Sequence, residues 1–300
     1  MNIGIIFGGE SHESEVSKNS GIAISKACKN LGYTTTDYFL EINSIDSEIN
    51  NLKKHDFVFI ALHGTFGEDG TLQKILEENK IKYNGADQFA SKKCFDKSFC
   101  KKIAINDGIL TPNFYAVESN ICNDNIGFTS SKYVIKPNSQ GSSVGFSVVD
   151  NFEDINSAID VALDFDNKVL IEEYIGGNEL TVPILGGQAF PVIEIIPKEG
   201  FYDYSAKYVK GMSEYVCPSE IGEKLTTEIK DTALRIHQLL GCEVYSRVDF
   251  KLFNNEIYFL EINTLPGMTE TSLFPMSAKN NNYSFEDVID KIIKLSLEKC

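Results

Sequence analysis

The sequence has no hydrophobic run long enough to cross a membrane. No stretch of its 300 residues approaches the roughly 18 consecutive apolar residues that a membrane-spanning helix needs. Residues 2–7 already have the pattern of a buried strand, with no charged leader before them. We therefore expect a cytoplasmic protein with no membrane partner.

Paired cysteine motifs are also missing. The chain has seven cysteines, an odd number, and they are scattered without any Cys-x-x-Cys spacing. Such a set fits neither a disulfide framework nor a zinc site, so we expect reduced thiols. The positions are Cys28, Cys94, Cys100, Cys122, Cys217, Cys242 and Cys300.

Positive charge is scarce in this chain. Lys and Arg number 28 against 43 Asp and Glu, which gives a formal net charge of −15. Binding to nucleic acid needs a basic face, so we expect no nucleic-acid partner. A hydrophobic content of 42% is ordinary for a folded protein, and 300 residues suffice for two or three cores. Any nucleotide must be held by locally placed cations.

The Walker order Gly-x-x-x-x-Gly-Lys-[Ser/Thr] is absent, but another glycine-rich loop follows a predicted strand. Residues 134–145 read VIKPNSQGSSVG, and glycines of this kind let backbone N–H groups approach a phosphate. Lys136 would add a positive charge, and Ser142 and Ser143 would add hydroxyl donors. The same residues could equally form the tip of a hairpin, so this loop alone does not establish a phosphate-binding site.

A second glycine-containing loop, residues 8–15, precedes a predicted helix and is acidic. Glu10, Glu13 and Glu15 lie in it. The N-terminus of a helix would attract a phosphate, but three carboxylates would repel one. A cationic ligand such as an amine suits this loop better.

The most informative stretch is residues 245–263, which we interpret as a β-hairpin. Because side chains alternate along a strand, Arg247 and Asp249 would project together from one arm, and Glu261 and Asn263 from the other. Two carboxylates and an amide oxygen suit Mg²⁺ or Mn²⁺, and Mg²⁺ suggests ATP. An amphipathic hairpin with a merely solvated polar face is the more common origin of such a pattern taken alone.

The register of this hairpin gives a geometric test. A two-residue turn at Asn254 and Asn255 would place Asp249 and Glu261 on opposite faces. We therefore predict a three-residue loop, residues 254–256, which sets Asp249 opposite Glu261 and Arg247 opposite Asn263. A two-residue register without a compensating bulge would remove this support.

The pattern of elements predicts a mixed α/β and α+β protein with three domains. Residues 1–87 form an open α/β unit with function at the carboxyl ends of its strands, 88–176 a small α+β unit, and 177–300 a larger α+β unit that carries the metal site. Helices are expected over residues 88–106 and 223–240 and at the C-terminus, where Ser284 and Asp287 form a capping box. Further strands are predicted at 56–62, 132–136 and 169–174.

Five blocks of the sequence occur in the order found in one enzyme family. They read FGGESHESEVSKNSG at 7–21, ALHGTFGEDGTLQ at 61–73, VIKPNSQGSSVGFS at 134–147, FYDYSAKY at 201–208, and SRVDF with LEINTLPGMTETSL at 246–250 and 260–273. Over essentially its whole length, the chain resembles the D-alanine–D-alanine ligase family, which are ATP-grasp enzymes of bacterial peptidoglycan synthesis. Two positions depart from the family pattern: Ser14 stands where the family usually has a basic residue or His, and Lys74 stands where glycine commonly follows the glutamine.

The resemblance implies two Mg²⁺ ions, or Mn²⁺, held by Asp249, Glu261 and Asn263 on the phosphates of ATP. It also implies a nucleotide site, with the lysines at the phosphates, Glu179 at the ribose and residues 172–175 at the adenine. The nucleotide-binding residues are Lys97, Lys136, Ser142, Ser143, Glu172, Glu173, Ile175, Glu179 and Lys207.

The resemblance further implies the sites for two D-alanine molecules. Glu13 would bind the ammonium group of the first, and Arg247 with the backbone N–H of Gly267 would form an oxyanion hole. Tyr208, Ser142 and Glu13 would hydrogen-bond across the closed site, with Tyr208 on a mobile loop. The substrate-binding residues are Glu13, His63, Lys207, Arg247, Gly267, Ser272 and Leu273. The family resemblance also suggests a homodimer.

Two of these residues are ambiguous without the family. His63 could act as a base or a ligand, although a structural histidine is the more common case, so we give it a supporting role. Gly267 follows Pro266 and could simply belong to a turn.

Several functions stay open from the sequence. One is the D-alanine–D-alanine ligase, and a second is a sister ligase that joins D-alanine to D-lactate or D-serine. Tyr208, in the segment DYSAKY, resembles the dipeptide-forming branch. A kinase that stops at phosphoryl transfer and a nucleotide-binding module without turnover are the remaining alternatives.

Overall fold

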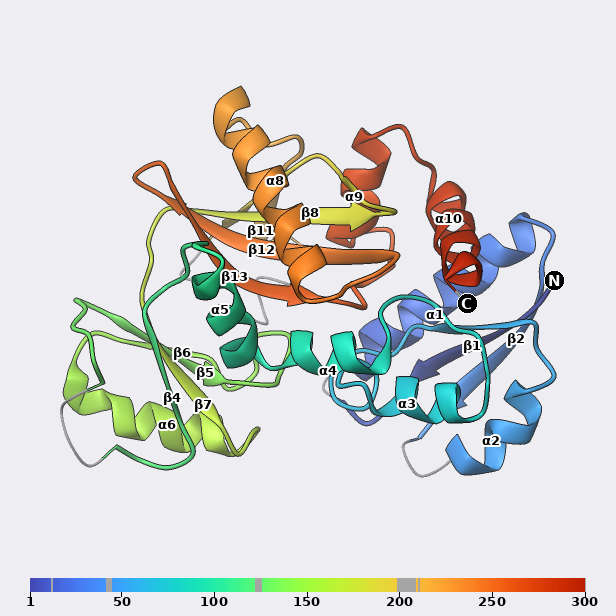
Figure 1. Cartoon of the computed structure of the whole chain (residues 1–300), viewed down its shortest axis with the longest axis horizontal. Helices are drawn as coiled ribbons and strands as arrows, with labels where there is room; N and C mark the ends of the chain where they lie inside the picture. Colours follow the sequence, from blue (N-terminus) through green and yellow to red (C-terminus); the bar gives the residue numbers. More distant parts are fainter. Residues whose placement is uncertain (12, 42–44, 122–125, 199–208, 210, 300) are drawn as a thin grey trace.

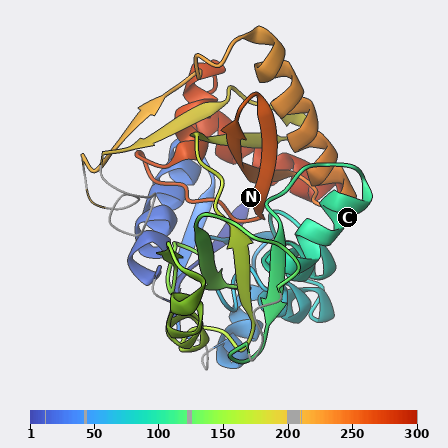
Figure 2. The same cartoon turned by 90° about the vertical axis from the view of Figure 1, so that its left-hand side faces the viewer.

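The chain is built on three β-sheets. The computed structural model describes residues 1–11, 13–41, 45–121, 126–198, 209 and 211–299. The sheets occupy separate parts of the molecule (Figure 1), and a view turned by 90° shows the large sheet above the small one, with the N-terminal unit farther from the viewer (Figure 2). The division into domains 1–87, 88–176 and 177–300 stays a prediction.

The N-terminal sheet is parallel, with strand order β2-β1-β3. The strands are β1 (Asn2–Gly8), β2 (Thr34–Leu40) and β3 (Phe57–Ile60), and the helices of this region are α1 (Ser14–Asn30), α2 (Ile45–Leu52) and α3 (Thr71–Glu78). The three isoleucines of β1 are completely buried and Phe7 is nearly so, as expected for a parallel sheet covered on both faces. The predicted strands at 2–7 and 56–62 are thereby confirmed. The C-terminal helix α10 (Phe285–Glu298) packs against α1, so the two ends of the chain share one core.

The small sheet is antiparallel, with strand order β4-β7-β5-β6. Its strands are β4 (Phe114–Val117), β5 (Tyr133–Pro137), β6 (Ser147–Val149) and β7 (Val169–Glu173). A short 3-10 helix (Phe152–Asp154) leads into α6 (Ile155–Leu163), which packs against the sheet. The strands predicted at 132–136 and 169–174 are therefore present.

The large sheet runs β11-β10-β8-β12-β13, with β9 added to β8. The strands are β8 (Asn178–Leu185), β9 (Gln188–Ala189), β10 (Ile193–Pro197), β11 (Ser213–Val216), β12 (Tyr245–Phe253) and β13 (Glu256–Asn263). Helix α8 (Glu223–Leu239) covers one face of this sheet, which confirms the helix predicted at 223–240, and α9 (Leu273–Asn280) packs on β8. The predicted capping box at Ser284 and Asp287 is also present.

The helix predicted over 88–106 is two helices. Helix α4 (Gln88–Phe95) ends and α5 (Lys97–Asn106) begins at Asp96, whose backbone is extended. The Asp96 side chain accepts a hydrogen bond from Phe99 N at 2.9 Å, so it caps the second helix. The break turns Lys97 into the first residue of a new helix, which brings its side chain to the site described below.

The turn of the β12–β13 hairpin differs from the prediction, although the predicted pairing of Asp249 with Glu261 is present. The turn has two residues, because Phe253 pairs with Glu256 and both Asn254 and Asn255 are left-handed, with φ of 52° and 63°. The predicted three-residue loop is therefore wrong. Two consecutive left-handed residues form the type I′ turn that suits the twist of a hairpin, and asparagine tolerates that conformation.

A β-bulge restores the predicted pairing. The register shifts between Asp249 and Phe250, so that Phe250 pairs with Phe259 but Asp249 pairs with Glu261, and Leu260 is the additional residue of β13. Arg247 then pairs with Asn263. The candidate metal ligands share one face because of this bulge and not because of the turn.

Candidate active site

A first cavity lies between the small sheet and the large sheet. Its volume is about 340 Å³. Apolar walls come from both sheets, including Val134, Ile195 and Leu260, and among the charged residues at its border are Lys97 and Glu261. The bulge at Leu260 explains why this leucine and the next residue, Glu261, both border the same cavity. The candidate nucleotide residues along this cavity are Lys97, Lys136, Ser143, Glu172, Glu173, Ile175 and Glu179.

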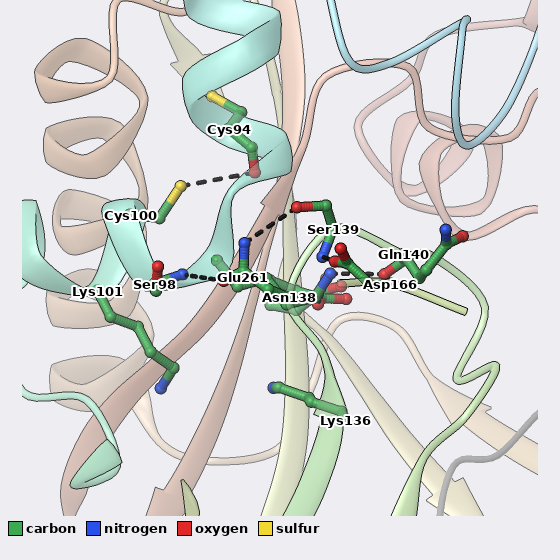
Figure 3. Close-up of polar contacts among 12 residues, drawn as sticks. Cys94, Ser98, Cys100, Lys101, Lys136, Asn138, Ser139, Gln140, Asp166 and Glu261 are labelled. Atoms are coloured by element: carbon green, nitrogen blue, oxygen red, sulfur yellow. Dashed lines mark hydrogen bonds and ion pairs between the residues drawn. The ribbon is translucent and has the colours of Figure 1, made fainter. Parts of the chain in front are cut away.

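The lysines of this cavity are held by carboxylates and carbonyl oxygens. Lys97 Nζ donates to the backbone oxygen of Gln140 at 2.6 Å and lies 3.4 Å from Glu261 Oε2. Lys136 Nζ lies 2.8 Å from Glu172 Oε2. The N-terminus of α5 is fixed to the glycine-rich loop, because Ser98 N donates to Asn138 Oδ1 at 2.9 Å (Figure 3). The ammonium groups of Lys97 and Lys136 thus belong to residues that border the cavity, and they can pair with a polyphosphate.

The glycine-rich loop crosses between two cavities. Ser142 and Ser143 are left-handed, with φ of 53° and 57°, and only Ser143 borders the first cavity. Ser142 Oγ instead donates a hydrogen bond to Glu13 Oε1, in the second cavity. A Cβ atom at Gly141 would lie 2.9 Å from Glu13 Oε2, so a larger residue there would have to displace the Glu13 carboxylate.

The second cavity, of about 600 Å³, lies between the N-terminal loops and the large sheet. Glu13 at the start of α1 and Arg247 on β12 border it, and so do Gly141 and Glu261, which also border the first cavity. The two cavities therefore adjoin. The predicted substrate residues that line the second cavity are Glu13, His63, Arg247, Gly267, Ser272 and Leu273.

The turn that carries Gly267 is built by its own hydrogen bonds. Thr269 N donates to Ser272 Oγ at 3.0 Å, and a Cβ atom at position 267 would meet the same oxygen at 3.0 Å. Ser272 lies directly before α9, and Leu273 is its first residue. Ser272 Oγ thus leaves little room for a side chain at position 267, and Gly267 itself borders the second cavity.

The candidate metal ligands lie together on the hairpin. Arg247 Nε and Nη2 lie 3.0 Å and 2.8 Å from the two carboxylate oxygens of Asp249, and Thr181 Oγ1 donates to Asp249 Oδ1 at 2.5 Å. Asn263 Oδ1 accepts a hydrogen bond from Leu265 N at 2.9 Å. Within the described part of the chain, no three His, Cys, Asp or Glu side chains are grouped closely enough to hold a metal ion. Two carboxylates and one amide oxygen are nonetheless a donor set that fits a hard cation.

Two family models match this chain. A family model described as the D-ala D-ala ligase C-terminus matches residues 108–294, and one described as the D-ala D-ala ligase N-terminus matches residues 35–86. The chain belongs to the D-alanine–D-alanine ligase family. A D-alanine–D-alanine ligase from Methylacidiphilum infernorum is 43% identical over 299 residues, which cover 98% of this chain and 95% of the relative.

Solved structures of the family show the same fold. A D-alanine–D-alanine ligase from Bacillus anthracis complexed with ATP is 32% identical, with a TM-score of 0.87 over 100% of this chain and 98% of that chain. VanG, a D-Ala:D-Ser ligase from Enterococcus faecalis, is 29% identical, with a TM-score of 0.83 over 99% of each chain. The predicted fold class, the mixed α/β architecture of the ATP-grasp D-alanine–D-alanine ligases, is confirmed. None of the described helices is both long and apolar enough to cross a membrane.

The structure does not describe every predicted residue of this family member. Lys207 and Tyr208 lie outside the described residues. The roles assigned to the other residues stay predictions, although the two cavities bring those residues together. The sequence patterns assigned no individual role to Val134 and Leu260, which lie in family blocks, or to Lys101, which lies in none.

Glu68 is a further residue of the second cavity to which the sequence patterns assigned no role, although it lies in a family block. It borders the second cavity, is buried, and its Oε2 accepts a hydrogen bond from Gly64 N at 2.7 Å. Burial and the nearby charge of Glu13 raise the pKa of Glu68 to about 8, despite that hydrogen bond. Burial also lowers the pKa of His63, in the same cavity, below its ordinary value. His63 Nε2 lies 3.4 Å from Ser20 Oγ, which fits the supporting role predicted for it.

The raised pKa of Glu68 predicts that the free energy of unfolding depends on pH. Between about pH 4.5 and 8 the unfolded chain releases the proton of Glu68 while the folded protein keeps it, so stability falls as pH rises. Glu68→Gln removes this dependence. As pH rises from about 4.5 to 8, the unmodified protein should lose stability that the variant keeps. The difference between their free energies of unfolding should therefore grow, in favour of the variant, by on the order of 1 kcal/mol for each pH unit. Urea titrations at four pH values measure the difference, and parallel curves would contradict the buried neutral carboxyl.

Proposed function

We propose that this chain joins two D-alanine molecules to D-alanyl-D-alanine with ATP, for the synthesis of peptidoglycan precursors. The observation that carries the proposal is the junction of the two cavities at Gly141 and Glu261. One cavity has the apolar walls and lysines that suit a nucleotide, and the other has a carboxylate and an arginine that suit an amino acid. Family membership and the ATP complex of the Bacillus anthracis ligase support the same reading.

The first cavity would hold ATP. Val134, Leu260 and Ile175 would pack against the base, and Glu179, which lies 3.0 Å from Lys251, would meet the ribose. The triphosphate would then extend toward the lysines, the backbone of the glycine-rich loop and the hydroxyl of Ser143. Lys97 and Lys136 would face its charge, and Lys207 would join them.

Two divalent cations, Mg²⁺ or Mn²⁺, would be held by Asp249, Glu261 and Asn263. Bound there, they would neutralise phosphate charge and orient the transferred group. Arg247 now occupies both oxygens of Asp249, so an incoming cation would share or displace this ion pair. That exchange would free the Arg247 guanidinium to stabilise the tetrahedral intermediate in the second cavity.

The second cavity would hold the amino acids. Glu13 would bind the ammonium group of the first D-alanine, whose carboxylate would then face the shared border with the first cavity. Arg247 and the N–H of Gly267 would stabilise the negative oxygen of the tetrahedral intermediate. Lys207 and Ser272 would receive the carboxylate of the second D-alanine, beside His63 and Leu273.

The reaction would proceed in two steps. The carboxylate of the first D-alanine takes the γ-phosphoryl group, giving D-alanyl phosphate and ADP. The amine of the second D-alanine then attacks the acyl carbon, phosphate leaves, and a proton is released with the dipeptide. Water must be excluded because acylphosphates hydrolyse, and the hydrogen bond between Ser142 and Glu13, extended by Tyr208, would help to close the site.

A D-alanine–D-serine or D-alanine–D-lactate ligase is the second candidate. The observation that favours it is the structural likeness to VanG, a D-Ala:D-Ser ligase. The closer sequence relatives are D-alanine–D-alanine ligases, and Tyr208 resembles the dipeptide-forming branch, so we place this candidate second.

Phosphate release from ATP and Mg²⁺ tests the proposal. We expect turnover with D-alanine, none with L-alanine or without an amino acid, and D-alanyl-D-alanine as the product by mass. Turnover that requires added D-serine or D-lactate would move the assignment to the second candidate. ATP binding without turnover under any condition would contradict both.

We also propose a cytoplasmic homodimer, in line with the family resemblance. The acidic net charge of −15 supports the absence of a nucleic-acid partner. Sedimentation at several protein concentrations would measure the assembly.

A further inference from the structure

A buried group of three charges lies behind the first cavity, and one member has no role in the proposed function. We name it the ion triad: Lys101 of α5, Glu172 of β7 and Lys136 of β5. Lys101 Nζ lies 2.8 Å from Glu172 Oε1, and Lys136 Nζ lies 2.8 Å from Glu172 Oε2. Figure 3 shows the side chains of Lys101 and Lys136 extending toward each other from helix and sheet.

The two lysines differ in their access to the cavity. Glu172 and Lys136 border the first cavity, whereas Lys101 is not among the residues that line it. The side chain of Lys101 has no exposed surface, and that of Lys136 is 13% exposed. Lys136 can therefore turn to an anionic ligand, while Lys101 stays behind the carboxylate.

Lys101 is held by two contacts besides its ion pair with Glu172. Its Nζ donates to Thr111 Oγ1 at 2.6 Å, and that hydroxyl donates to the backbone oxygen of Phe259 at 2.8 Å. The ring of Phe114 lies 5.5 Å from Nζ, a cation–π distance. A buried ammonium group with these partners keeps one geometry, so it can hold Glu172 in one orientation.

Glu172 has acceptor capacity that the triad does not use. An ionised carboxylate has about four lone-pair directions. Oε1 is buried and accepts no directed hydrogen bond from the described residues, although Lys101 is close to it. Burial lowers the pKa of Lys101 to about 8, and although burial alone would raise the pKa of Glu172, its two lysines bring it below the usual value. Both partners are thus charged at neutral pH, and the carboxylate can only accept.

The family resemblance already places Glu172 at the adenine. We propose that Lys101 is a positioning residue for it: Lys101 fixes the Glu172 carboxylate at the wall of the first cavity, so that the carboxylate selects a purine that carries an amino group at position 6. A carboxylate accepts a hydrogen bond from that amino group and repels a carbonyl oxygen in the same place. Lys101 also leaves the triad with a net charge of +1, so Lys136 can serve the phosphates. Without Lys101, Glu172 would hold Lys136 alone. The inference rests on the proposed function.

Nucleotide selectivity tests the proposal. Steady-state kcat and KM are measured with ATP, with purine riboside triphosphate, which has hydrogen at position 6, and with inosine triphosphate, which has a carbonyl there. The unmodified protein should prefer ATP. Lys101→Met should reduce the preference for ATP over purine riboside triphosphate about ten-fold and raise the KM for ATP, because a hydrogen bond to a charged group is lost or misaligned. The KM for D-alanine should stay the same.

A double-mutant cycle separates positioning from a structural role. Glu172→Gln should lower the same preference, and adding Lys101→Met to it should lower the preference no further, because Lys101 acts through Glu172. Lys102→Met is the matched control, since Lys102 is exposed on the same helix. Thr111→Val, a milder change, loosens the same ammonium group and should shift the preference in the same direction if Lys101→Met does not fold.

Two results would overturn the inference. One is a Lys101→Met protein of lowered stability that keeps the full preference for ATP. The other is a further loss of preference when Lys101→Met is added to Glu172→Gln. An unmodified protein without turnover would instead reject the proposed function, so the two failures are distinguishable.

Discussion

Arg247→Met is expected to lower kcat about a thousand-fold while leaving the KM for ATP nearly unchanged. Arg247 borders the second cavity and is not among the residues that line the first. Removal of one preorganised donor from an oxyanion site typically costs 10²–10³ in rate, and here a full positive charge is lost as well. The fold should survive, because Asp249 keeps its hydrogen bond from Thr181 Oγ1 at 2.5 Å.

The step that fails identifies the role of Arg247. If the guanidinium acts on the tetrahedral intermediate, D-alanyl phosphate should still form while dipeptide release stops. Exchange of oxygen isotope between the bridging and nonbridging β,γ positions of ATP reports the first step alone and should persist in the variant. Loss of exchange and of dipeptide together would place Arg247 in phosphoryl transfer instead.

A matched control is available on the surface. Arg235 forms a pair with Asp107 at 2.7 Å, and the arginine side chain is 56% exposed. Arg235→Met should change neither rate nor product, since exposed ion pairs contribute little. A rate for Arg247→Met within ten-fold of the unmodified protein would remove Arg247 from the oxyanion site.

The hairpin shows how far the sequence could predict the candidate site. The predicted pairing of Asp249 with Glu261 is confirmed, but the three-residue loop from which it was derived is wrong, and a bulge produces the pairing instead. A bulge has no sequence signal as strong as a turn, because the additional residue, Leu260, is an ordinary strand former.

Buried polar residues were the least predictable part of the chain. Lys101 sits one position before Lys102 in the sequence, yet one is completely buried and the other exposed. Helical periodicity does not distinguish a buried lysine from a solvated one, since burial of charge depends on a partner from another element, here Glu172 of β7. Glu68 was missed as well.

Glu261→Gln is expected to lower kcat/KM for ATP more than about a hundred-fold. Glu261 borders both cavities, pairs with Asp249 across the hairpin and lies 3.4 Å from Lys97. Glutamine keeps the size of the side chain but removes the charge that a divalent cation and Lys97 both need. Changes in residues that merely support a metal ligand already cost 10–100-fold, and a direct ligand should cost more.

Metal binding distinguishes this loss from a local distortion. Titration with Mn²⁺ in the presence of nucleotide should show weaker binding in Glu261→Gln, while the free energy of unfolding without metal changes by less than about 1 kcal/mol, because the side chain is 29% exposed. Glu256→Gln, an exposed carboxylate on the same strand, is the control and should bind Mn²⁺ normally. If activity is lost but the Mn²⁺ affinity is unchanged, Glu261 is not a metal ligand and acts only through its ion pair with Lys97. If activity is unchanged, the reaction does not take place at the border of the two cavities.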